Sequence, residues 1–139
     1  MRFLVVDAEH RTVRLVEADD PQHVYELAGL DALHVDHAIV ARSNELGLGI
    51  GIAVFEHGLF APPAATFYFS IGRQMYAGNA VLYAFDAAGE TISMPRSPPP
   101  VMFYRSYREV EAAIARDEID RPQTMMNGAA IWAWPESPQ

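Results

Sequence analysis

The chain of 139 residues carries 10 basic and 18 acidic side chains, has a formal net charge of −8, and contains neither lysine nor cysteine. The missing lysine excludes a Schiff-base amine and a phosphate-loop lysine. The missing cysteine excludes thiol nucleophiles, disulfides, iron–sulfur clusters and cysteine-ligated zinc. The negative charge repels a phosphate backbone, and the arginines are scattered along the chain, so we expect no nucleic-acid partner.

Length and hydropathy predict one compact domain over residues 1–139. The length matches the usual domain size of about 100–150 residues, and 50% of the residues are apolar. The apolar run at 46–55 is far shorter than the roughly 20 residues of a membrane span. The N-terminal apolar run is short and is interrupted by Asp7, so we expect no secretory signal there. We therefore expect a cytoplasmic protein without membrane contact, and the alanine-rich, arginine-only composition indicates a bacterial source.

The first 41 residues predict a hairpin, a helix and a strand. Residues 3–6 and 13–16 are apolar and β-branched and are joined by a polar segment, which is typical of a hairpin. Asp20 can cap a helix that begins at Pro21, and Gly29 can end it, so a helix is predicted at about 21–28. From Leu33 the apolar residues alternate, which predicts a strand. A β–α–β arrangement of these elements would add one parallel pair.

Residues 47–54 alternate between glycine or alanine and a branched aliphatic residue. A strand with this sequence has one bulky face and one nearly bare face, which lets a backbone, a ring or a ligand approach closely. The spacing of Gly47, Gly49 and Gly51 matches part of a dinucleotide-binding fingerprint, but that fingerprint requires a helix directly afterwards. The sequence therefore favours a strand, and a small ligand bound against the glycine face stays open.

The second half predicts more hairpin-linked strands and one further helix. Strands are expected at 66–71, 75–85 and 91–94, with a turn at 72–74, a bulge or second turn at 78–79 and a hairpin turn at 86–89. The proline-rich segment 95–100 predicts an extended connector within the domain. Ser106 and Glu109 have capping-box spacing, which predicts a helix at about 106–117. A turn at 127–128 predicts a last strand at 129–134. Together these elements predict an α+β fold with a largely antiparallel sheet built from hairpins and two helices.

His34 and Asp36 form the first candidate site. Two residues apart on a strand, they would point the same way and could bind one divalent metal. A third ligand would have to come from elsewhere in the chain, and the candidates are His10, His57, Asp7 and Glu56. With Zn²⁺ or Mn²⁺ activating a water, this would be a small metal-dependent hydrolase. An ordinary polar strand face is the favoured interpretation, so no metal or cofactor is assigned, and His37 points to the opposite face.

Other residues point to a general base or to an interface. Glu56 could tune His57 as a general base, although a polar turn is the simpler interpretation. Trp132 and Trp134 share one face of the predicted last strand, where they would complete the core or anchor another subunit. Because arginine is the sole cation, an interface must use planar ion pairs. The first charges expected in such an interface are Arg73, Arg105 and Arg108.

Three stretches within about residues 50–92 carry a resemblance. They are Glu56-His57-Gly58-Leu59-Phe60 with Pro62-Pro63, then Ala77-Gly78-Asn79-Ala80-Val81-Leu82, and Asp86 followed by Gly89-Glu90. This pattern resembles a small uncharacterised family carried by phages and bacterial mobile elements. The resemblance implies a compact β-rich domain and brings no functional site with it.

The sequence therefore favours a non-enzymatic protein that binds a protein partner or a second copy of itself. The contact surface would be a sheet edge or the aromatic C-terminal strand. The charge of −8 suits contact with a basic surface. The alternative is the metal-dependent hydrolase that uses His34, Asp36 and a third ligand.

Overall fold

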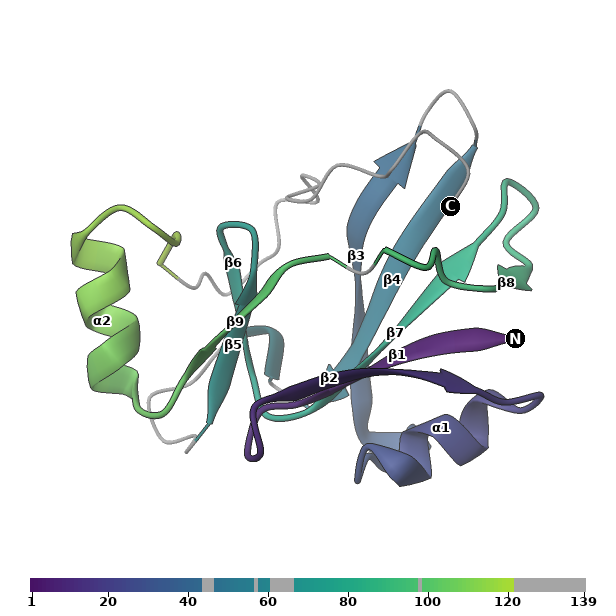
Figure 1. The fold of residues 1–139 in the computed structure, drawn as a ribbon, viewed down its shortest axis with the longest axis horizontal. Coiled ribbons are helices and arrows are strands. Elements are labelled where there is room, and N and C mark those ends of the chain that lie inside the picture. Colours follow the sequence, from purple (N-terminus) through teal and green to yellow (C-terminus); the bar gives the residue numbers. More distant parts are fainter. Residues whose placement is uncertain (44–46, 57, 61–66, 98, 122–139) are drawn as a thin grey trace.

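The protein folds into four layers (Figure 1). The computed structural model describes residues 1–43, 47–56, 58–60, 67–97 and 99–121. Helix α1 (Pro21–Leu27) packs on the outer face of a six-stranded sheet, and helix α2 (Tyr107–Ala115) packs on the outer face of a three-stranded sheet. The two sheets face each other across the main core. The α+β class, the largely antiparallel sheet and both predicted helices are confirmed.

The large sheet is antiparallel throughout its described pairings. β8 (Thr91–Ile92) pairs with one central strand, β7, and the order of the others is β2 (Thr12–Glu17), β1 (Arg2–Asp7), β7 (Ala80–Phe85), β4 (Leu48–Phe55) and β3 (Val35–Ser43). The β–α–β arrangement with a parallel pair, which the sequence left open, does not form, because β2 and β3 lie at opposite edges. β3 pairs instead with β4, the strand that follows it directly, and such sequence neighbours are the commonest partners.

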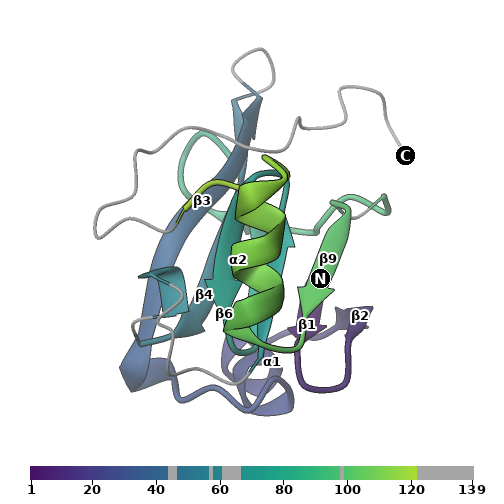
Figure 2. The ribbon, with the colours of Figure 1, turned by 90° about the vertical axis from the view of Figure 1, so that its left-hand side faces the viewer.

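The small sheet has the order β6 (Gln74–Ala77), β5 (Tyr68–Ile71) and β9 (Val101–Tyr104). Sequence reasoning missed β9, since only five residues separate the proline-rich connector from the cap of the next helix. The connector runs from β8 in the large sheet to β9 in the small sheet. Figure 2 shows α2 in front of the small sheet, where Val110 and Ala113 pack on Tyr68 and Met75.

The core between the sheets is made by one face of each sheet. The large sheet contributes alternate residues of its central strands. The small sheet contributes those residues of β5 and β6 that point away from α2, namely Phe69, Ile71 and Tyr76. Complete burial of each such side chain stabilises the fold by about 1.5–3 kcal/mol. The fully buried members include Leu4, Val6, Ile50, Ile52, Val54, Leu82, Phe69, Ile71 and Tyr76.

The segment 75–85 is divided at Gly78 and Asn79, where the sequence left a bulge or a second turn open and the structure has the turn. Gly78 has a φ of 81°, and the chain passes there from β6 in the small sheet to β7 in the large sheet. The Asn79 side chain accepts a hydrogen bond from the Ala8 N–H (2.9 Å) and donates one to the Ala28 carbonyl (3.1 Å). This residue therefore joins the crossover to the β1–β2 turn and to the end of α1.

Local capping accounts for both helices. The Asp20 carboxylate accepts from the Gln22 N–H at the start of α1, and Ser106 Oγ accepts from the Glu109 N–H at the start of α2. The chain leaves α2 through Asp117, whose φ is 59°. Arg73, in the β5–β6 turn, donates to the carboxylate of Asp117 (2.6 Å) and that of Asp120 (2.8 Å). Arg73 is thus engaged within the chain and fastens the end of α2 to the small sheet.

The tyrosine hydroxyls of the small sheet give a test of the packing. Tyr76 is fully buried, and its hydroxyl has no hydrogen-bond partner among the described residues, whereas the Tyr104 hydroxyl bonds to Ser70 Oγ (3.2 Å). Tyr76→Phe should raise the free energy of unfolding by about 1 kcal/mol, because a desolvated and unpaired hydroxyl is removed. Tyr104→Phe makes the same chemical change and should lower it by about 1 kcal/mol. Urea unfolding at pH 7.5 measures both.

The free energies of unfolding of the wild type and of Tyr76→Phe should differ more at alkaline pH. Burial raises the pKa of the Tyr76 hydroxyl, so the folded chain keeps this proton at pH values where the unfolded chain, with a pKa of about 10, releases it. The free energy of unfolding of the wild type therefore falls as the pH rises above about 10, and Tyr76→Phe lacks that part of the fall. The advantage of the variant should grow by about 1.4 kcal/mol per pH unit there. A constant difference from pH 7 to 11 would contradict the burial of this hydroxyl.

Candidate functional site

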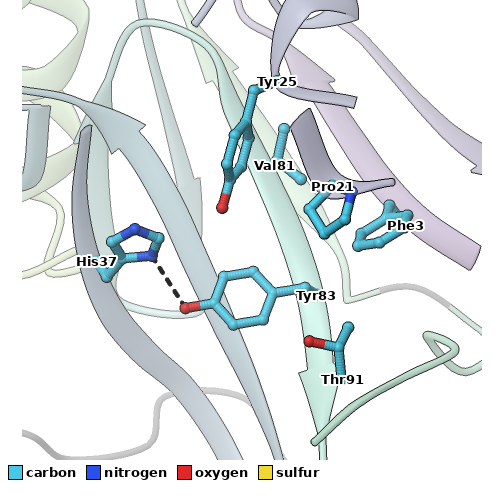
Figure 3. Close-up of a pocket in the computed structure, with 7 residues that line it drawn as sticks. All are labelled: Phe3, Pro21, Tyr25, His37, Val81, Tyr83 and Thr91. Carbon is cyan, nitrogen blue, oxygen red and sulfur yellow. Dashed lines mark hydrogen bonds between the residues drawn. The ribbon is translucent and has the colours of Figure 1, made fainter. Parts of the chain in front are cut away.

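A hollow of about 210 Å³ opens on the outer face of the large sheet, beside α1 (Figure 3). The helix covers the neighbouring part of this face, where Val24 and Ala28 pack on Phe3, Val5 and Val81. The hollow lies next to this contact. Its described lining residues come from β1, α1, β3, β7 and β8, and they are Phe3, Pro21, Tyr25, His37, Val81, Tyr83 and Thr91.

The bare face of β4 explains why Tyr83 lies where it does. Gly51 pairs with Tyr83 and Gly49 pairs with Phe85 across the β4–β7 ladder. A Cβ built on Gly51 would come within 2.5 Å of the Tyr83 ring, and one on Gly49 would collide with the Phe85 ring. Both rings therefore lie against glycine backbone. Of the three occupants that the sequence allowed for the glycine face, the structure places rings there.

Polar atoms gather on one side of the hollow. His37 Nδ1 and the Tyr83 hydroxyl share a hydrogen bond of 3.0 Å, and their rings meet edge to face with centroids 5.9 Å apart. The Tyr25 hydroxyl points from α1 toward the space between these two side chains (Figure 3). Burial raises the pKa of Tyr25, and burial together with the nearby Tyr25 raises the pKa of Tyr83. Both phenols are therefore protonated at neutral pH and can donate hydrogen bonds.

The structure separates the residues of the predicted metal site. His34 belongs to a 3₁₀ turn (Ala32–His34), and Asp36 lies in β3, so the prediction that both lie on one strand is wrong. The cause is local, because Asp31 caps the turn through the Leu33 N–H (3.0 Å) and its other oxygen bonds His34 Nδ1 (2.8 Å). The Asp31 carboxylate raises the pKa of His34, and the hydrogen bonds from the Leu33 N–H and from His34 lower the pKa of Asp31.

The proposed third ligands do not complete a metal site in the described part of the chain. His10 bonds the Asp7 carboxylate at 2.8 Å, in the β1–β2 turn. Across the described ranges, no three side chains of His, Asp or Glu lie close enough together to hold a metal ion. His57 lies outside these ranges, so the hypothesis of a general base beside Glu56 is not tested.

The remaining candidates divide between the surface and the undescribed end of the chain. Arg105 and Arg108 are exposed near the start of α2, and the Arg105 backbone N–H donates to the Glu109 carboxylate (2.6 Å). The predicted strand at 129–134, with Trp132 and Trp134, lies outside the described residues. The sequence did not predict that the lining residues of the hollow, such as Tyr25, His37 and Tyr83, come together.

One signal for the hollow was present in the sequence. The alternation of Tyr83 and Phe85 matches the glycine alternation of β4, so the rings and the bare face could have been paired. His37 is on the strand face opposite the one considered for metal binding, and this face lines the hollow. The contribution of α1 had no such signal, because its placement depends on the fold.

Comparison of the chain with protein-family models, curated proteins and solved structures finds no match. The resemblance of residues 50–92 to a family from phages and bacterial mobile elements therefore stays a prediction. Neither of the two described helices has the length and apolar character needed to cross a membrane.

The contact between Gly51 and Tyr83 is open to a double-mutant test. Gly51→Ala should lower the free energy of unfolding by about 2 kcal/mol, because the new methyl group forces the ring out of place. In a Tyr83→Ala background the same change should cost less than about 0.5 kcal/mol, since the colliding ring is absent. Equal costs in the two backgrounds, measured by urea unfolding, would show that the ring does not lie on Gly51.

Proposed function

We propose that this chain is a non-enzymatic binding protein and that the hollow beside α1 is its recognition site. One observation carries the proposal, namely a small concave site with a buried apolar floor and a cluster of hydrogen-bonding side chains on one side. Binding sites for small ligands typically combine these two features. A cytoplasmic location in a bacterium belongs to the same proposal and is supported by composition.

The chemistry of the lining residues favours binding over catalysis. A tyrosine that acts as a base or nucleophile at neutral pH needs a lowered pKa, whereas the pKa values of Tyr25 and Tyr83 are raised. The described lining contains no carboxylate and no serine. The metal-dependent hydrolase with His34 and Asp36 gains no support, since His34 is bonded to Asp31.

An unbiased fragment screen tests the binding function. The ¹⁵N-labelled chain is titrated with aliphatic, aromatic, anionic and cationic fragments, and amide shifts are followed by NMR. We expect compounds that shift the amides of Tyr25, His37, Tyr83 and Thr91, with Kd values of about 0.1–10 mM that are usual for fragments. Gly51→Ala, which displaces Tyr83, should weaken these shifts. If no fragment of any class shifts these amides, the hollow is not a recognition site.

Self-association is a second candidate form of binding, and two exposed apolar side chains favour it. Leu33 is 88% exposed and Phe55 is 55% exposed. They lie at the same end of the β3–β4 ladder, where the Glu56 N–H donates to the His34 carbonyl (2.9 Å). A β-bulge between Ile39 and Ala41 disfavours pairing along the edge of β3 itself. We propose this apolar end as the contact surface with a second copy.

Light scattering after gel filtration measures the mass of this assembly. The wild type should exceed the monomer mass of 15.4 kDa at high concentration. Leu33→Ser should return it to the monomer, because an exposed apolar anchor is lost. The matched control is Leu15→Ser, a 40% exposed leucine on β2 at the other edge of the sheet, which should behave as the wild type. A wild type that is monomeric at about 1 mM would dismiss self-association while leaving the hollow untouched.

A further inference from the structure

We propose that the hollow takes one uncharged flat ring that carries a hydrogen-bonding group, such as a phenol or an indole. The ring would be either a free small molecule or an aromatic side chain of a partner protein. The inference rests on the proposed binding function and adds the chemical class of the ligand.

The size limits the ligand to one small ring system. Sites for drug-sized ligands and cofactors usually enclose about 300–1,000 Å³. The hollow, at about 210 Å³, is smaller than this range. A dinucleotide or a long chain would therefore extend far outside it, whereas one ring can lie largely inside.

The walls favour an aromatic ligand. Phe3 and Val81 are each 1% exposed and form an apolar floor. The Tyr25 and Tyr83 rings stand at two sides, and Pro21 adds a further apolar surface (Figure 3). Aromatic rings in stacked or edge-to-face geometry attract each other beyond the effect of the area they bury. A flat ring gains this contact, and an aliphatic ligand of equal size does not.

The polar atoms call for a neutral hydrogen-bonding group on that ring. The Tyr25 hydroxyl points toward the bonded pair of His37 and Tyr83, so one hydroxyl or N–H of a ligand placed there can reach several partners. The described lining has neither a carboxylate nor a guanidinium. Apart from His37, whose Nδ1 bonds the Tyr83 hydroxyl, the described lining thus offers a charged ligand no opposite charge for the hydration it would lose, which is costly.

Four probes of similar size test the class. They are phenol, toluene, benzoate and benzylammonium, each titrated into the labelled chain at pH 7 while the amides around the hollow are followed by NMR. Phenol should bind about five- to tenfold more tightly than toluene, which corresponds to one hydrogen bond. Benzoate and benzylammonium should bind more weakly than phenol. Toluene equal to phenol, or a charged probe that binds more tightly than phenol, would overturn the class.

Tyrosine variants assign the hydrogen bond. Tyr25→Phe and Tyr83→Phe keep both rings, and at least one of them should remove most of the preference for phenol over toluene. Tyr104→Phe is the matched control, because its hydroxyl bonds Ser70 in the small sheet, away from the hollow. A preference unchanged in both hollow variants would overturn the assignment, and the wild-type comparison still decides the class if a variant does not fold.

Two further titrations distinguish an aromatic side chain of a partner from a free aromatic molecule. The fragment screen distinguishes a failure of this ligand class from a failure of the binding function. N-acetyltyrosinamide and N-acetyltryptophanamide represent side chains of a partner, and phenol and indole represent free molecules. If the blocked amides bind with the same affinity as the free rings, the ligand is a partner's side chain, and if they do not bind, it is a free molecule.

If only aliphatic or charged fragments shift the amides of the hollow, the ligand class fails and the binding function stands. If no fragment does, both fail.

Discussion

The alternation of small and bulky residues in β4 is the constraint on which both faces of the large sheet depend. Ile50, Ile52 and Val54 point into the space between the sheets and are fully buried. Gly49 and Gly51 point to the other face and leave room for rings from β7. One short segment thus builds the apolar core on one side and seats the wall of the hollow on the other.

The connections between the layers rely on a few polar contacts of high specificity. Asn79 uses both ends of its amide, one on the β1–β2 turn and the other on the last turn of α1. Arg73 reaches two carboxylates near the end of α2 from the turn between β5 and β6. A planar guanidinium can serve two acceptors at once, which a lysine ammonium does with less directional control. A chain without lysine is well suited to such contacts.

The hollow follows from these constraints rather than from a motif. Helix α1 has only one fully buried residue, Val24, and seven residues in all, so it covers part of the outer sheet face and leaves the region near His37 and Tyr83 open. The glycines hold Tyr83 against the sheet, and the ring becomes a wall of the opening. Asp31, by contrast, holds His34 in the 3₁₀ turn that directly precedes β3. Local capping thus places His34 outside the strand on which the metal site with Asp36 was predicted, and the packing of α1 and β7 on the sheet forms the hollow.

Local signals were sufficient for most secondary structure. Capping residues predicted both helices to within two residues at each end, and the residue pattern predicted the hairpin of β1 and β2 and the hairpin turn at 86–89 between β7 and β8. The same alternation in β4 indicated a bare face. These features depend on neighbours within a few residues, so the chain encodes them directly.

The amino-acid sequence by itself determined the class of fold, the two helices and the glycine face of β4. The tertiary structure alone decided that the segment 75–85 divides between two sheets, that β3 lies at the edge beside β4, and that Tyr25, His37 and Tyr83 converge. Tyr25 and His37 are 12 residues apart in the sequence, and 46 residues separate His37 from its bonded Tyr83. A contact over that separation depends on how the sheets and α1 pack as a whole, and no local preference of the chain specifies it.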